Sequence, residues 1–157
     1  MSYLKEIMAY KRNLTSAIVS NKDIVQILST ANTQATDDLL NDNIYPFLYI
    51  PDTATSREIY ICVDIDVPRV KNKVCEAMQV YIDIICHKMK NLTGKGYTNI
   101  DMLQYLIAKE LLQRAEEFGL GDLDLRSSSG IVKLPSDYVG RELVFTATNI
   151  RIAGCDE

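Results

Sequence analysis

The sequence has few of the features that identify nucleic-acid-binding proteins. Its 17 basic and 21 acidic side chains are interspersed and leave a net charge of -4. No basic stripe is present to bind a phosphate backbone, so we do not expect free DNA to be a principal ligand. An acidic chain is nonetheless compatible with lining a path for DNA, because a conduit must let the polyanion slide.

Long apolar runs are also missing. A membrane-spanning helix needs roughly 20 consecutive apolar residues, and no run in this chain approaches that length. The first twelve residues alternate charged with apolar side chains, so we expect neither a signal peptide nor a membrane contact. With 157 residues, 47% of them hydrophobic, the chain fits one cored domain over residues 1–157.

Cysteine and histidine are too sparse to suggest a metal or nucleophile site. The cysteines, which form no C-x-x-C pair, are Cys62, Cys75, Cys86 and Cys155. Three lie in apolar surroundings, so we expect buried free thiols and no disulfide framework. The single histidine, His87, adjoins Cys86, but neighbours in a strand point to opposite faces and cannot form a catalytic pair. We expect no catalytic residue, no metal site and no cofactor.

Paired carboxylates raise the alternative of a small cytosolic nuclease-like enzyme. Asp64 and Asp66 are two residues apart in an expected strand, as metal-binding carboxylates can be. Such a core also needs a lysine two residues after an acid, and the chain contains no D-x-K or E-x-K. The loop at residues 91–97, where that active site would lie, lacks the glycine and hydroxyl pattern of a phosphate-binding loop. The enzyme therefore remains the weaker alternative.

Helical periodicity predicts helices at residues 2–19 and 23–28, within an N-terminal helical segment over residues 1–30. A third helix is expected at about residues 99–118, with Asn99 as its cap and Gly119 at its end. Its apolar stripe consists of Ile100, Leu103, Ile107, Leu111, Ala115 and Phe118. Residues 29–43 are expected to form a loop with at most one helical turn, at residues 37–40.

Alternation of apolar and polar residues predicts the strands. It is strict over residues 59–67 and weaker over 78–87. Two further strands are expected around residues 122–126 and 142–148, on either side of a serine-rich loop. The run between Pro46 and Pro51 is expected to be an edge strand or an extended segment. These elements predict an α+β fold over residues 44–150, with an antiparallel or mixed sheet, helices on one face, and a C-terminal tail at 151–157.

Five blocks of sequence, taken in order, resemble a family of small neck proteins of tailed phages and prophages. The first covers residues 44–70 and consists of apolar segments separated by prolines. The others are C-H-K (86–88), G-K-G-Y-T-N-I-D (94–101), F-G-L-G-D-L-D-L (118–125) and Y-V-G-R-E-L-V-F (138–145). The likeness covers about residues 40–150, and its specificity lies in the order of the blocks.

This resemblance implies a tail terminator or tail-completion protein, a non-enzymatic subunit of the virion neck that is assembled in the host bacterial cytoplasm. It implies a six-membered ring that caps the tail tube and joins it to the head-closure connector. The implied partners are the tail-tube protein, the connector protein and DNA that passes without specific binding. Another connector component, such as a head-closure or tube-related protein, is the alternative within the same biology.

Charged residues are the candidate contacts of such a ring. They are Asp64, Asp66, Arg69, Lys71, Lys73 and Lys95. The two aspartates, with Asp122 and Asp124, would suit a DNA conduit if they faced the lumen. The basic cluster after Pro68 fits either a solvated turn or a contact to an acidic partner or DNA phosphates. The polar loops at residues 29–43 and 91–99 are too long for tight turns and are expected to contact neighbouring proteins.

Overall fold

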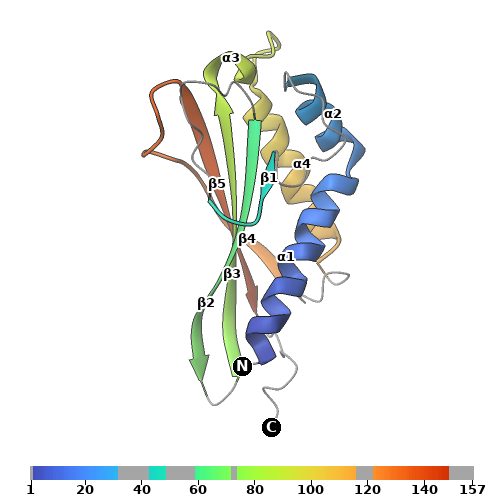
Figure 1. Ribbon diagram of the computed structural model, residues 1–157, viewed down its shortest axis with the longest axis vertical. Coiled ribbons are helices and arrows are strands. Elements are labelled where there is room, and N and C mark those ends of the chain that lie inside the picture. Colours follow the sequence, from blue (N-terminus) through green and yellow to red (C-terminus); the bar gives the residue numbers. More distant parts are fainter. Residues whose placement is uncertain (1, 32–42, 49–58, 72–73, 116–121, 149–157) are drawn as a thin grey trace.

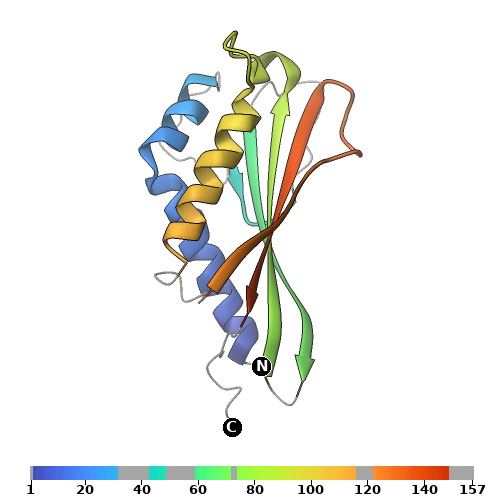
Figure 2. The ribbon, with the colours of Figure 1, turned by 180° about the vertical axis from the view of Figure 1, so that it is seen from behind.

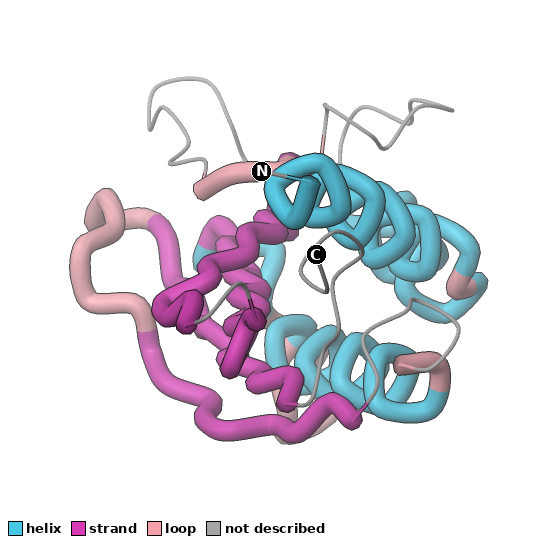
Figure 3. Tube along the Cα trace, turned by 90° about the horizontal axis from the view of Figure 1, so that it is seen from below, coloured by secondary structure: helices cyan, strands magenta, loops and turns pink. Residues whose placement is uncertain are grey.

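The computed structural model describes residues 2–31, 43–48, 59–71, 74–115 and 122–148. It has an α+β fold in which one layer of helices covers one face of a twisted, mixed five-stranded sheet (Figures 1 and 2). The end-on view separates the two layers, with helices on one side and strands on the other (Figure 3). The α+β fold class predicted from the sequence is confirmed. None of the described helices is both long and apolar enough to cross a membrane.

The elements follow one another in a simple order. They are α1 (Ser2–Ser20), α2 (Lys22–Ala31), β1 (Ile44–Tyr45), β2 (Ile59–Lys71), β3 (Val74–His87), α3 (Lys88–Asn91), α4 (Asn99–Gln113), β4 (Asp122–Gly130) and β5 (Tyr138–Thr148). The strand order in the sheet is β1-β2-β3-β5-β4. Strand β1 is parallel to β2, whereas the other neighbouring pairs are antiparallel.

The main core lies between the helices and the sheet. Alternating residues of β2, β3 and β5 point toward the helices, and they include Ile61, Val63, Ile82, Ile84, Leu143 and Phe145. Leu14 and Ile18 of α1 and Leu28 of α2 are fully buried against them. The predicted alternation is confirmed for Ile59, Ile61, Val63 and Ile65, which all face this core, whereas the side chain of Val67 lies outside the description.

Helix α4 buries the predicted stripe, since Ile100, Leu103, Ile107 and Leu111 are all in the core. Its cap is Thr98 rather than Asn99, which is the first helical residue. Thr98 accepts a hydrogen bond from the Asp101 backbone while the Asp101 carboxylate accepts one from the Thr98 backbone, which forms a capping box and lowers the pKa of Asp101. The helix ends at Gln113, earlier than predicted. Phe118 and Gly119 lie outside the described residues.

The structure revises two parts of the strand prediction. An edge strand, β1, lies at Ile44–Tyr45, before Pro46; residues 46–48 form no strand, which leaves the alternative of an extended segment there, and residues 49–51 lie outside the description. The serine-rich segment is part of β4, where Ser127, Ser128 and Ser129 pair with β5 after a bulge. Serine is tolerated there because β4 is an edge strand whose side chains are mostly exposed. Most of the loop predicted at residues 29–43 lies outside the description, although α2 extends through Ala31.

Candidate functional site

The sheet face opposite the helices carries the main cluster of candidate contact residues. Cross-strand neighbours on this face form three rows. The rows are Cys62–Asp83–Glu142–Ser129, Asp64–Tyr81–Val144–Ser127 and Asp66–Gln79–Thr146–Asp124. We call these twelve residues the acidic face. The prediction that Asp64 and Asp66 share one sheet face is confirmed, and Asp124 joins them; the side chain of Asp122 lies outside the description.

Asp83 is the most unusual residue of the acidic face. It is only 4% exposed, and its Oδ1 has no hydrogen-bond partner in the structure. Burial, followed by the hydrogen bond and the charge of the facing Glu142, raises the pKa of Asp83 to about 8. The Asp83 carboxyl therefore keeps its proton near neutral pH. Asp83 was not identified from the sequence.

Apolar side chains near Asp83 shield its carboxyl group from solvent. One end of the same sheet face is covered by an apolar cluster of Tyr60, Cys62, Ile85 and Tyr138, with Ile131 and Leu134 of the β4–β5 loop packed on it. That loop approaches closely because position 140 is glycine. A Cβ there would lie 2.7 Å from Leu134 Cδ1 and 2.9 Å from Ile131 Cδ1. Asp83 lies where this apolar cover meets the acidic face.

Asp64 lies at the outer border of the acidic face. Lys11 of α1 reaches it from the helix side, with 2.8 Å between Lys11 Nζ and Asp64 Oδ1. The same ammonium group donates a hydrogen bond to the carbonyl oxygen of Pro46, just after β1. Part of the Asp64 charge is thus compensated within the subunit, whereas Asp66 and Asp124 are exposed.

The predicted basic cluster lies at the distal end of the β2–β3 hairpin. Arg69 pairs with Ala77 after a register shift, and Lys71 pairs with Val74 at the last step. Among the described residues, β5 pairs with β3 from Ala77 onward, and the β2–β3 hairpin extends beyond the described end of β5 (Figure 1). Lys73 lies in the connection, outside the described residues. Arg69 and Lys71 thus belong to β2, which continues beyond the strand predicted over residues 59–67, and the turn interpretation is wrong for these two residues.

Lys95 follows α3, at the end of the molecule opposite the β2–β3 turn (Figure 1). The loop between α3 and α4 closes with a bridge between Leu92 and Thr98. Two glycines flank Lys95, and both have positive φ angles, 73° at Gly94 and 84° at Gly96. Glycine adopts this backbone conformation without the strain of a side chain. The loop therefore presents Lys95 on an exposed tip.

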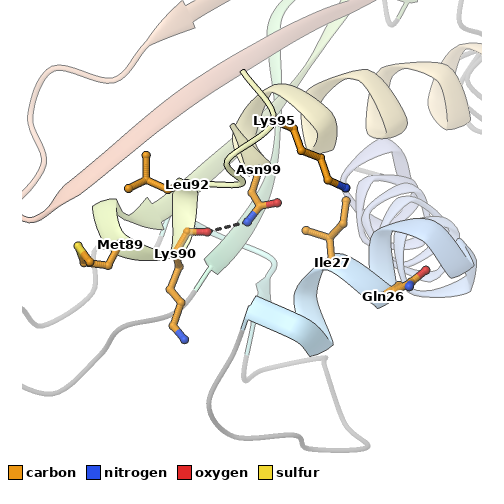
Figure 4. Close-up of a pocket in the computed structure, with 7 residues that line it drawn as sticks. All are labelled: Gln26, Ile27, Met89, Lys90, Leu92, Lys95 and Asn99. Atoms are coloured by element: carbon orange, nitrogen blue, oxygen red, sulfur yellow. Dashed lines mark hydrogen bonds between the residues drawn. The ribbon is translucent and has the colours of Figure 1, made fainter. Parts of the chain in front are cut away.

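A groove of about 430 Å³ runs between this loop and α2. Figure 4 shows its lining, formed by Gln26, Ile27, Met89, Lys90, Leu92, Lys95 and Asn99. Asn99 Nδ2 donates to the carbonyl oxygen of Lys90 at 2.6 Å, and Asn91 Oδ1 accepts from the Ile100 backbone at 3.0 Å. These bonds fix α3 to the start of α4. The Lys95 side chain extends toward α2 (Figure 4).

The same end of the molecule exposes apolar side chains. Met89 is 68% exposed and Leu92 is 70% exposed, and Lys88 lies beside them in the sequence. We call Met89, Leu92 and their neighbouring lysines, Lys88, Lys90 and Lys95, the α3 tip. A mixed apolar and basic surface of this kind is typical of a protein contact, because large apolar side chains gain from being covered. The loop at residues 91–99 was predicted as a contact surface, but the apolar part of it in α3 was missed.

Cys86 and His87 point to opposite faces of β3, as predicted. Cys86 is in the main core, where burial raises the pKa of its thiol to about 12. His87 caps α3 by accepting a hydrogen bond from the Met89 backbone at Nδ1, and its ring contacts Tyr138 edge to face. The described cysteines, Cys62 and Cys86, are not in disulfides. No group of three or more His, Cys, Asp or Glu residues in the described parts of the chain is arranged to hold a metal ion.

Comparison with known proteins gives one family. The model of the YomW family, which is phage-related, matches residues 7–147. This range includes most of the helix layer, the whole acidic face and the α3 tip. No curated protein matches the chain.

Proposed function

The chain belongs to the YomW family, and from this phage-related origin we propose that it is a structural protein of the virion neck. In this proposal it is a tail terminator or tail-completion subunit that forms a ring on the tail tube and joins it to the head-closure connector. Its role is to bind neighbouring proteins, without catalysis, while DNA passes without specific binding. The match over residues 7–147 is the observation that carries the proposal.

The distribution of surfaces supports a subunit with several different neighbours. The α3 tip is apolar and basic, whereas the acidic face lies on the sheet and the β2–β3 hairpin ends in a basic segment. A closed ring of identical copies needs two different surfaces that meet each other, and further surfaces for the proteins above and below. The described part of this chain offers two such surfaces with distinct chemistry, the α3 tip and the acidic face, and the sequence adds basic residues at the end of the β2–β3 hairpin.

We assign the α3 tip to a contact with a different neck or tail protein. Met89 and Leu92 project from a short helix that is anchored to α4 by Asn91 and Asn99. A rigid support lowers the entropy lost when a partner covers these side chains. The flanking lysines favour an acidic rim on that partner.

Deletion of the gene tests the proposed function directly. We expect filled heads and separate tails, with some tails of irregular length, while capsid assembly and DNA packaging proceed. Electron microscopy of the lysate and a count of infectious particles measure both. Normal infectious particles would rule out a neck function. Heads that lose their DNA, or a block before packaging, would instead indicate another connector component.

A complementation experiment tests the α3 tip. The double variant Met89→Asp and Leu92→Asp should fold, because both side chains are exposed, yet leave heads and tails unjoined. Met8→Asp is the matched control, since Met8 is 65% exposed on α1 and lies outside the tip. Equal rescue of the deletion by both variants would remove the α3 tip from the contact.

A further inference from the structure

The groove between α2 and the loop after α3 continues past Lys95 into a second compartment of about 370 Å³. The two compartments share Ile27 of α2, Lys95 and Asn99 in their walls, so the Lys95 side chain borders both. Their volumes, about 430 Å³ and 370 Å³, fall within the range of roughly 300–1,000 Å³ that is usual for ligand sites. The groove is thus large enough to receive side chains of another molecule.

The first compartment is basic. Lys90 of α3 and Lys95 of the loop both line it, and none of the described residues in its wall is acidic. Neither lysine forms an ion pair with an acid in the described part of the chain. Asp23, which is the acid among the described residues of the second compartment, lies at the start of α2. Two unpaired cations on the walls of one hollow concentrate their field inside it, so the first compartment favours an anion.

Apolar side chains surround these cations. Ile27 and Leu92 line the first compartment, beside the exposed Met89. The apolar side chains that the second compartment adds are Tyr97, Met102 and Leu106. Such surface gains from being covered by other apolar groups. A protein segment that carries a carboxylate and an apolar side chain matches both compartments, whereas the phosphates of a DNA backbone match the lysines alone.

Hydrogen bonds hold the wall that carries Lys95. The Thr93 hydroxyl donates to the carbonyl oxygen of Tyr97 and accepts a bond of 3.2 Å from the Lys95 backbone. The bridge between Leu92 and Thr98 closes the loop. A preformed wall loses little conformational freedom when a partner binds, so even a short segment can be held here.

We propose that this groove is the binding site for an acidic segment of a partner protein. A carboxylate of the segment lies between Lys90 and Lys95, and a neighbouring apolar side chain enters the second compartment beside Tyr97. The inference rests on the proposed function for the nature of the partner, a neck or tail protein. It deepens the contact at the α3 tip by naming the chemistry of the segment that the partner contributes.

Nuclear magnetic resonance titration of the purified full-length chain tests this site. The probe is a short peptide that carries glutamates around a single leucine. One counterpart has glutamine in place of each glutamate, and a second has serine in place of the leucine. The groove variant carries Lys90→Gln and Lys95→Gln. The matched control carries Lys5→Gln and Arg12→Gln, which removes the same charge from exposed positions of α1.

We expect the acidic peptide to cause saturable shifts of the amide signals around Ile27, Lys95 and Tyr97. The glutamine and serine counterparts should each bind several-fold more weakly, because one lacks the charge and the other lacks the apolar side chain. The groove variant should show a similar loss toward the acidic peptide, whereas the control variant should bind it like the wild type. Short duplex DNA should leave these signals unchanged.

Absence of saturable shifts, equal binding of the acidic and glutamine peptides, or equal losses in the groove and control variants would each overturn the site. Shifts of the groove signals with duplex DNA but not with the peptide would assign the groove to nucleic acid instead. Shifts of these signals that follow the protein concentration alone would assign it to a second copy of the chain.

The deletion experiment is independent of this result. Peptide binding in the groove together with normal infectious particles after deletion would keep the site for an acidic segment and remove the neck function. Separate heads and tails after deletion, without peptide binding, would keep the neck function and remove the site.

Discussion

Replacing Asp83 with asparagine should remove most of the pH dependence of stability between about pH 5 and 8. The folded chain holds this carboxyl with a pKa of about 8, against 3.8 for the unperturbed group. The folded state therefore keeps a proton at pH values where the unfolded chain has released it. Stability is complete below the unfolded pKa and is lost as pH rises toward the folded one.

The size of the loss follows from the separation of the two pKa values. At about 1.4 kcal/mol per unit, four units set an upper bound of about 6 kcal/mol. The facing Glu142 side chain is partly exposed, so the site can relax and admit water when Asp83 ionises, which lowers the loss below this bound. We expect the wild type to lose about 2–4 kcal/mol of unfolding free energy between pH 5 and 8.

Urea unfolding followed by circular dichroism at several pH values measures this loss. The Asp83→Asn protein should give a nearly level profile, because an amide does not titrate and can donate to Glu142. Asp124→Asn is the matched control, since Asp124 is exposed on the same face and should keep the wild-type slope. Parallel losses in the wild type and in Asp83→Asn would show that the buried carboxyl does not hold the proton.

Three further predictions concern the core, the thiols and the cap of α4. Ile107→Ala should lower the free energy of unfolding in urea by roughly 2–4 kcal/mol, because the side chain is fully buried. Tyr105→Ala, on the exposed side of the same helix, should lower it much less. Equal losses for the two variants would place the Ile107 stripe outside the core. Cys62 and Cys86 are buried, so neither should react quickly with a thiol reagent in the native state, and fast labelling of both would contradict the burial. Thr98→Ala removes the capping box and should destabilise by about 1 kcal/mol, whereas Thr93→Ala in the preceding loop should leave α4 intact.

The parts of the fold that depend on local pattern were predictable. Alternation over residues 59–67 fixes which side of β2 is buried, and the spacing from Ile100 to Leu111 fixes the buried side of α4. The capping box was also readable, as Thr98 followed by Asp101, but the neighbouring Asn99 was chosen as the cap. Local signals of this kind need no knowledge of the partner strand.

The Asp83 and Glu142 pair could not be found in this way. The two residues are far apart in the sequence, and only the register of β3 against β5 places them opposite each other. One signal was present, because Asp83 is the sole charged residue between Val80 and Cys86, a run that is otherwise apolar apart from Tyr81. A lone acid in such a run is usually buried and needs a partner.

The contact of Lys11 with Asp64 has a consequence for the border of the sheet at β2. Among the described residues β1 pairs with β2 over only two positions, so within the described part of the chain the rest of this border has no neighbouring strand. Open borders of this kind promote indiscriminate strand pairing and precipitation. Lys11 and Asp64 place opposite charges across the border, 2.8 Å apart, and a foreign strand would have to displace this bridge in order to pair. The ion pair between Lys11 and Asp64 thus hinders aggregation of free chains through this border.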